Sequence, residues 1–219
     1  MDIATYIEHT NLSPTLTIKA IDQLVVDAKQ FKFLGVCVPP FWVQRAKREI
    51  GTEKILLVTV AGFPLGYSMT ETKLDEIKRA IDNGADEVDV VWNISSFKTE
   101  IPWTKIEIAK CSKLAHDYQK ILKVIIETAY LSDEEIVMAC KICADSGADF
   151  VKTSTGFASS GAKEEHIKLM KASLPPSVGI KASGGIKTLG QTMEMINAGA
   201  TRIGTSSGIR ILEELNNKT

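Results

Sequence analysis

The sequence lacks an excess of either charge. Its 219 residues hold 26 Lys and Arg against 27 Asp and Glu, a formal net charge of -1. Nucleic acids and acidic membranes attract proteins with a concentrated basic surface, so we expect neither as a partner. Long hydrophobic runs are also missing: none approaches the ~20 apolar residues of a membrane span. The N-terminus has no basic start followed by an apolar stretch, and we therefore expect a cytoplasmic protein.

Cysteine is scarce, and its spacing does not indicate a metal site. The sequence has 4 Cys, of which Cys140 and Cys143 form a C-x-x-C pair. This spacing occurs in redox and zinc sites, but no second Cys or His pair stands at ligand spacing. Both cysteines lie on one face of a segment with helical period. We expect them to be buried small hydrophobic residues, and we expect no metal.

Short apolar runs alternate with amphipathic helical segments along the whole chain. The expected strands are residues 6–11, 35–38, 55–61, 87–91, 122–127, 148–152, 178–182 and 201–204. The expected helices are residues 17–31, 39–50, 70–83, 103–117, 132–147, 163–173, 188–198 and 207–215. Nearly continuous apolar strands indicate a parallel sheet covered by helices. A doubly wound open sheet is the alternative, but no G-x-G-x-x-G follows the first strand. We predict an α/β fold, a (β/α)8 TIM barrel that forms one domain over residues 1–219.

A lysine ends one of the buried strands. In the run from Ala148 to Phe157, Phe150 and Val151 precede Lys152, and a polar loop follows. Burial makes an ammonium group expensive to keep charged, which suits an amine that attacks a carbonyl. The alternative is a lysine with a buried stem and a solvated head.

Two further polar residues are expected beside Lys152. The carboxyl ends of the strands form the active face of such a barrel. Strand alternation turns Asp89, Lys152 and Lys181 inward, and Lys152 and Lys181 belong to neighbouring strands. Like charges disfavour each other's ionisation, so one of the two lysines should be driven toward the neutral amine.

Two glycine-containing loops predict an anion site. Residues 183–188 follow the seventh expected strand, and residues 204–208 follow the eighth at a helix start. Backbone N–H groups in such loops favour phosphate, and phosphate sites in these barrels form there. The candidate binding residues are Thr155, Gly184, Gly185, Ser206 and Ser207. Ordinary turn chemistry is the alternative for each loop.

Weaker candidates surround the trio. The run Glu8-His9-Thr10 ends the first strand, and Cys37 lies near the end of the second. Lys123 and Glu127 share an inward parity on the fifth. We expect Glu8, Cys37 and Lys123 to support the site from behind. A thiol that lines a barrel is more often part of the core than a nucleophile.

Nearly the whole chain resembles the class I deoxyribose-phosphate aldolase family. The segments that carry the resemblance are 87–91, 151–156, 179–185 and 204–207, with a lysine in K-T-S-T-G and a second in K-x-x-G-G. The resemblance implies cleavage of 2-deoxyribose 5-phosphate to acetaldehyde and glyceraldehyde 3-phosphate. Lys152 would form the Schiff base, while Lys181 and Asp89 perturb it and relay protons. No cofactor is required.

The chain departs from the family pattern at four points. Glu8 stands where many members have Asp, Pro39 replaces a frequent Asn, and Phe157 stands where some members have a phosphate-side Lys. The chain also ends without the longer tail seen in some members. Another Schiff-base sugar-phosphate lyase or transaldolase, and a barrel that binds a sugar phosphate without turnover, remain alternatives. A small sugar phosphate is the expected partner, and a homodimer is left open.

Overall fold

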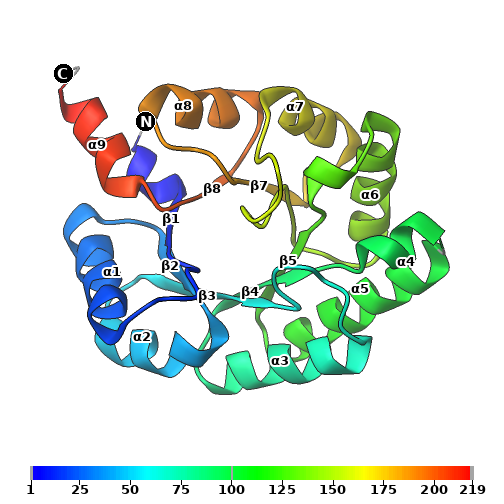
Figure 1. Cartoon of the computed structure of the whole chain (residues 1–219), viewed down its shortest axis with the longest axis horizontal. Coiled ribbons are helices and arrows are strands. Elements are labelled where there is room, and N and C mark those ends of the chain that lie inside the picture. Colours follow the sequence, from blue (N-terminus) through cyan, green and yellow to red (C-terminus); the bar gives the residue numbers. More distant parts are fainter. Residues whose placement is uncertain (1, 100, 218–219) are drawn as a thin grey trace.

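The structure, a computed structural model, describes residues 2–99 and 101–217. Eight parallel strands close into a barrel in chain order (Figure 1). They are β1 (Ile7–Thr10), β2 (Gly35–Val38), β3 (Leu56–Ala61), β4 (Glu87–Val91), β5 (Ile121–Ile125), β6 (Phe150–Lys152), β7 (Gly179–Ser183) and β8 (Arg202–Thr205). Each strand pairs with the next, and β8 returns to β1 with Ile7 opposite Ile203. The predicted (β/α)8 barrel is confirmed, while its predicted bounds of 1–219 include residues outside the described ranges.

Helices surround the barrel (Figure 1). They are α1 (Ile18–Phe31), α2 (Val43–Ile50), α3 (Thr70–Asp82), α4 (Ile94–Thr99), α5 (Ile101–Asp117), α6 (Asp133–Asp145), α7 (Glu164–Ser173), α8 (Leu189–Ala198) and α9 (Gly208–Asn216). Short 3-10 turns are η1 (Ile3–Tyr6), η2 (Pro40–Trp42) and η3 (Thr128–Tyr130). None of the helices in the described part of the chain has the length and apolar character needed to cross a membrane.

Side-chain caps start several of these helices where the sequence indicates. Ser132 and Glu135 form a complete capping box at α6: the Glu135 N–H donates to Ser132 Oγ at 3.3 Å, and the Ser132 N–H donates to Glu135 Oε2 at 2.8 Å. Thr17 and Thr188 cap α1 and α8 in the simpler way. Each cap satisfies N–H groups that have no partner within the helix.

Two helical segments differ from the sequence prediction. The helix expected from Pro39 begins as the 3-10 turn η2, and regular α-helix starts only at Val43. The segment Ile94–Thr99, for which no element was predicted, forms α4. The side chain of Asn93 accepts the Ser96 N–H at 3.0 Å, and the ring of Phe97 stacks on Trp92 with a centroid distance of 4.4 Å. Local capping and one aromatic contact thus form a helix too short to show a period.

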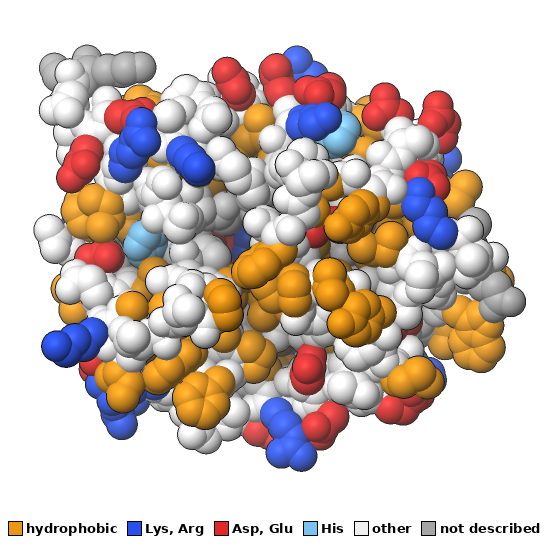
Figure 2. All heavy atoms as spheres, in the orientation of Figure 1, with side chains coloured by type: hydrophobic (Ala, Val, Ile, Leu, Met, Phe, Trp, Pro, Cys, Tyr) orange, Lys and Arg blue, Asp and Glu red, His pale blue; other side chains and the backbone are white. Residues whose placement is uncertain are grey.

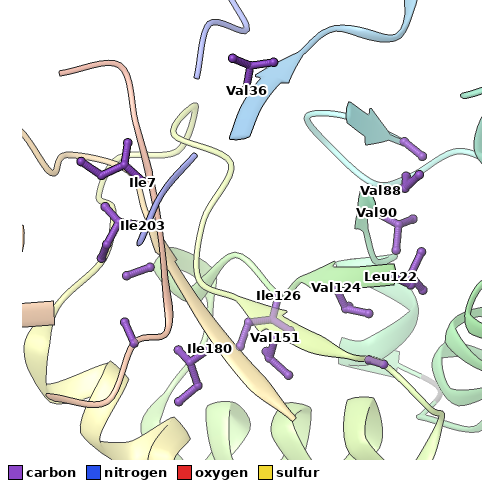
Figure 3. Close-up of a cluster of buried hydrophobic side chains, with 14 of the residues drawn as sticks. Ile7, Val36, Val88, Val90, Leu122, Val124, Ile126, Val151, Ile180 and Ile203 are labelled. Carbon is purple, nitrogen blue, oxygen red and sulfur yellow. The ribbon is translucent and has the colours of Figure 1, made fainter. Parts of the chain in front are cut away.

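The main core lies between the barrel and its helices. Alternate strand residues such as Val88, Val90, Leu122, Val151 and Ile180 point outward into it and are buried (Figure 3). Cys140 and Cys143 belong to the same core as free thiols, which confirms their interpretation as buried residues. Because one set of strand residues faces this core, the other set must face the barrel axis.

The barrel interior is apolar on one side only. Cys37, Val58 and Val60 form a small buried cluster inside β2 and β3. The other strands turn charged residues toward the axis, and these residues build the site described next.

Candidate active site

A cavity of about 330 Å³ opens at the carboxyl ends of β6, β7, β8 and β1. Lys152 contributes to its wall, and its side chain is only 3% exposed. Figure 2 shows a hollow near the middle of the molecule, with hydrophobic side chains beside it. The strand that carries Lys152 is three residues long, so the lysine stands where strand gives way to loop.

Asp89 joins the two lysines predicted to lie beside it. Its Oδ2 atom accepts a hydrogen bond from Lys152 Nζ at 2.8 Å and another from Lys181 Nζ at 2.7 Å. Lys152 and Lys181 are also register partners on β6 and β7. The structure therefore brings the predicted trio together, with the Nζ atoms of both lysines on one carboxylate oxygen.

The trio continues into a larger set of ionisable side chains, all buried except Arg202, which we call the ion column. It consists of Lys152, Asp89, Lys181, Glu8, Lys123, Glu87 and Arg202. Glu8 Oε2 accepts from Lys181 Nζ, and Lys123 Nζ lies 3.1 Å from Asp89 Oδ1 and 3.5 Å from Glu8 Oε1. Glu8 therefore contacts Lys181 directly, although it was expected only behind the site.

Sequence reasoning missed Glu87 and Arg202. Glu87 pairs with Lys123 and lies 3.5 Å from Arg202 Nη2. Both residues begin their strands, and each lies two residues before an inward position, Asp89 or Gly204. Gly204 faces Lys181, because a Cβ there would be 3.1 Å from Lys181 Cε. The alternation of inward and outward residues along β4 and β8 could therefore have predicted that both side chains face the barrel axis.

Opposite charges fix the protonation of most of the ion column. Burial disfavours the charged form of Lys181, but Asp89 and Glu8 outweigh it and raise the pKa of this lysine. Burial likewise opposes ionisation of Asp89, yet Lys123, Lys152 and Lys181 hold its pKa well below the ordinary value. The pKa of Glu8 is lowered in the same way, against burial, by Lys123 and Lys181. Lys181 is thus held charged, so it is not the neutral amine expected of the pair.

Cys37 belongs to the apolar side of the barrel. It is fully buried, and burial raises the pKa of its thiol to about 11. A thiol with this pKa is protonated near neutral pH and is a poor nucleophile. Its place in the cluster with Val58 and Val60 agrees with the core interpretation.

Thr155 lines the cavity, but its hydroxyl is used within the protein. Its Oγ1 bonds to Glu127 Oε2 and accepts the Phe157 N–H at 3.1 Å, and its own N–H donates to Glu127 Oε2 at 3.1 Å. Glu127 has a left-handed backbone with φ 53°. Burial raises the pKa of Glu127 although the Thr155 bonds oppose this. The pair holds the loop after Lys152 in place.

Residues of both predicted anion loops also line the cavity. Gly184, Gly185 and Ser206 line it, whereas Ser207 is not among the lining residues. The Ser207 N–H donates to Thr205 Oγ1 at 2.9 Å, and Ser207 is the residue that precedes the first turn of α9. Gly185 has φ 78° with nothing near its missing Cβ, so the backbone conformation is what requires glycine there.

Two further side chains line the cavity beside these loops. Lys187 lines the cavity and was missed as a site residue, although it stands in the predicted loop. Phe157 also lines the cavity, with its ring edge-on to Phe63 at a centroid distance of 5.3 Å. Phe157 stands where the family pattern has a lysine in some members, and Lys187 supplies a cation in the same cavity. In the described ranges, no group of three or more His, Cys, Asp or Glu is placed to hold a metal ion.

Residues 3–214 match the family described as DeoC/LacD family aldolase. A curated deoxyribose-phosphate aldolase of Thermococcus gammatolerans is 47% identical over 220 residues, which cover 99% of this chain and 98% of the relative. The deoxyribose-phosphate aldolase of Lactococcus lactis subsp. cremoris is 45% identical, covering 98% of this chain and 97% of the relative.

Solved structures agree with the sequence relatives. The structure described as "QR15, an Aldolase" is 41% identical with a TM-score of 0.94, and the match covers 100% of this chain and 97% of the other. A deoxyribose phosphate aldolase of Aeropyrum pernix, described as tetrameric, is 31% identical with a TM-score of 0.91, covering 99% and 92%. The chain belongs to the DeoC/LacD family of aldolases.

Proposed function

We propose that this chain is a deoxyribose-phosphate aldolase, a carbon–carbon lyase that cleaves 2-deoxyribose 5-phosphate to acetaldehyde and glyceraldehyde 3-phosphate. The observation that carries the proposal is the contact of Lys152 and Lys181 with one oxygen of Asp89, with Lys152 on the wall of the cavity. A sugar phosphate suits the cavity because Lys152 and the anion loops line the same space.

Lys152 is the nucleophile in this proposal. Its neutral amine attacks the aldehyde carbon of the open-chain sugar, and loss of water from the carbinolamine gives a protonated imine. The imine accepts the electron pair of the C2–C3 bond as the C3 hydroxyl loses its proton. Glyceraldehyde 3-phosphate leaves, and the remaining enamine is protonated at C2. Water then hydrolyses the imine to acetaldehyde and restores the amine.

Asp89 and Lys181 handle the protons of these steps. Both the carbinolamine and the enamine steps need a group that takes or gives a proton at the reacting atoms. Lys181 is held charged by Asp89 and Glu8, so it supplies a fixed positive charge beside Lys152. Asp89, which bonds to both lysines, connects them as a path for protons.

The phosphate is assigned to the part of the cavity that the loops after β7 and β8 line. Gly184, Gly185 and Ser206 offer backbone N–H groups, and Lys187 offers a charge on the same wall. Thr155 and Ser207 are proposed to shape this end through the loops they hold. Cys37 and Lys123 are proposed to support the trio from behind. The cytoplasmic location and a homodimer stay predictions.

Turnover tests the proposal directly. The protein is incubated with 2-deoxyribose 5-phosphate, and release of acetaldehyde is followed with a coupled NADH-dependent dehydrogenase. We expect steady cleavage by the parent and none by Lys152→Ala. A fructose-type ketose phosphate offered in parallel separates this activity from that of a transaldolase. Ligand-induced stabilisation without turnover would leave only a sugar-phosphate-binding barrel.

A further inference from the structure

Arg202 lies at the end of β8 that is away from the cavity. It is the first residue of that strand, whereas Gly204, Thr205 and Ser206 at the other end line the cavity. Its guanidinium lies over the Phe150 ring at 5.3 Å from the centroid, and its side chain is 19% exposed. The lysines of the ion column are at most 3% exposed, so Arg202 is where the column reaches solvent.

Alternating charges connect Arg202 to Lys152. Arg202 Nε lies 3.7 Å from Glu8 Oε1, and the other oxygen of Glu8 accepts from Lys181 Nζ. Lys181 and Lys152 then share Asp89 Oδ2. Charges inside a barrel of low polarity are screened far less than charges in water, so a change at one end is felt at the other.

The contacts of Arg202 do not have the form of an anchoring salt bridge. An arginine used for anchoring makes two parallel hydrogen bonds to one carboxylate. Here Nε finds no hydrogen-bond partner among the described residues, and Nη2 reaches Glu87 at only 3.5 Å. The Glu8 oxygen nearest to Arg202 is also without a hydrogen bond. The arginine therefore contributes charge more than geometry.

The other groups around Lys152 do not cancel this charge. The facing carboxylates are Asp89, Glu8 and Glu87 inside the barrel and Glu127 two residues after β5. The remaining titratable groups are Lys123, Lys181 and the thiol of Cys37. The buried residues that β3 turns toward the barrel axis are the apolar Val58 and Val60. Glu127 bonds to Thr155 and not to a cation. Each carboxylate thus favours the ammonium form of Lys152, and each cation favours its neutral amine.

We propose that Arg202 is a positioning residue for the aldolase reaction, which favours the reactive neutral amine of Lys152 through the charges of the ion column. The inference rests on the nucleophilic role of Lys152 proposed above. Removing the positive charge of Arg202 should favour the ammonium form of Lys152, so the reaction should need a higher pH. Removing the negative charge of Glu87 should act in the opposite direction.

The test measures Lys152 without requiring turnover. Trace labelling with acetic anhydride over a pH series, followed by mass spectrometry of the Lys152 peptide, gives the pH at which the reactivity of this amine reaches half of its maximum. Arg202→Met removes the charge and keeps an apolar stem over Phe150, and Arg202→Lys keeps the charge. Arg210→Met is the matched control, because Arg210 is 62% exposed on α9 and pairs with Glu214.

We expect Arg202→Met to move this midpoint, and the acid limb of kcat/KM, up by roughly half a pH unit. Glu87→Gln should move both down, and Arg202→Lys and Arg210→Met should match the parent. An unmoved midpoint in Arg202→Met, or an equal shift in Arg202→Lys, would overturn the proposal. If Arg202→Met does not fold, Glu87→Gln decides: a downward shift supports the proposal, and an unmoved midpoint contradicts it. A parent that labels normally but never cleaves substrate would instead reject the proposed function.

Discussion

At the scale of single residues, the site depends most on Asp89, which contacts three lysines. It faces Lys152, Lys181 and Lys123 at 2.7 to 3.1 Å and is fully buried. Asp89→Asn keeps the shape but removes the charge that holds Lys181 protonated and the path between the two lysines. Because positioned proton transfer contributes about 100-fold or more, kcat should fall at least ~100-fold.

The Asp89→Asn measurement needs a stability control. Loss of one partner of a buried ion pair costs about 3–5 kcal/mol, so kcat must be referred to the folded fraction found by urea unfolding. A folded variant that keeps kcat within a few-fold of the parent would remove Asp89 from the proton path.

Lys187 makes a separate prediction about the phosphate. Lys187→Ala should raise KM for 2-deoxyribose 5-phosphate about tenfold, because one charge-assisted hydrogen bond is lost. Cleavage of unphosphorylated 2-deoxyribose should not change. Lys168→Ala, at a lysine that is 63% exposed on α7, is the matched control. An equal rise in KM for both sugars would place Lys187 outside the phosphate site.

The sequence was sufficient to place the inward residues and insufficient to place their partners. Strand alternation alone turned Asp89, Lys152 and Lys181 inward. That Glu87 and Arg202 meet depends on how β4 and β8, which are not neighbours, are staggered across the barrel. The lining role of Lys187 and the absence of Ser207 from the wall depend on loop conformation, which no periodicity encodes.

At the scale of elements, the apolar strands were the predictable part of the fold. All eight appear within two residues of the expected positions, because a run of buried residues between polar loops is a strong local signal. The helix α4 was missed because it depends on the Asn93 cap and the packing of Phe97 on Trp92. Tertiary contact, rather than local preference, decides such short elements.

The α6 capping box offers a prediction about an element that carries no site residue. Ser132→Ala removes the acceptor for the Glu135 N–H and should cost about 1 kcal/mol of unfolding free energy. For a domain of this size Tm should fall by ~2–4 °C, with kcat and KM unchanged. Thermal unfolding and initial rates check both parts. A drop in kcat would show that α6 positions β6 and Lys152.

At the scale of the whole molecule, the ion column should limit stability at both ends of the pH range. The pKa values of Asp89 and Glu8 are lowered, so their contribution is present above the ordinary carboxyl value and is lost as pH falls toward the folded values. The pKa values of Lys181 and Lys123 are raised, so their contribution is present below the ordinary lysine value of 10.5 and is lost as pH rises through the folded values.

Urea unfolding across this range checks the prediction. The contribution of the ion column to the free energy of unfolding should be level between about pH 5 and about pH 10 and should decline on both sides. In Asp89→Asn the acid decline should become shallower, since one depressed carboxyl is gone. An unchanged acid slope in this variant would show that other carboxylates control acid unfolding.

Borohydride trapping shows whether Lys152 forms a Schiff base with the substrate. The protein is incubated with acetaldehyde or 2-deoxyribose 5-phosphate, reduced and digested, and the modified lysine is located by mass spectrometry. We predict an ethyl adduct on the Lys152 peptide with acetaldehyde, absent in Lys152→Ala and retained in Lys187→Ala. An adduct on Lys181 would reverse the two lysine roles, and no adduct on either lysine would contradict the account.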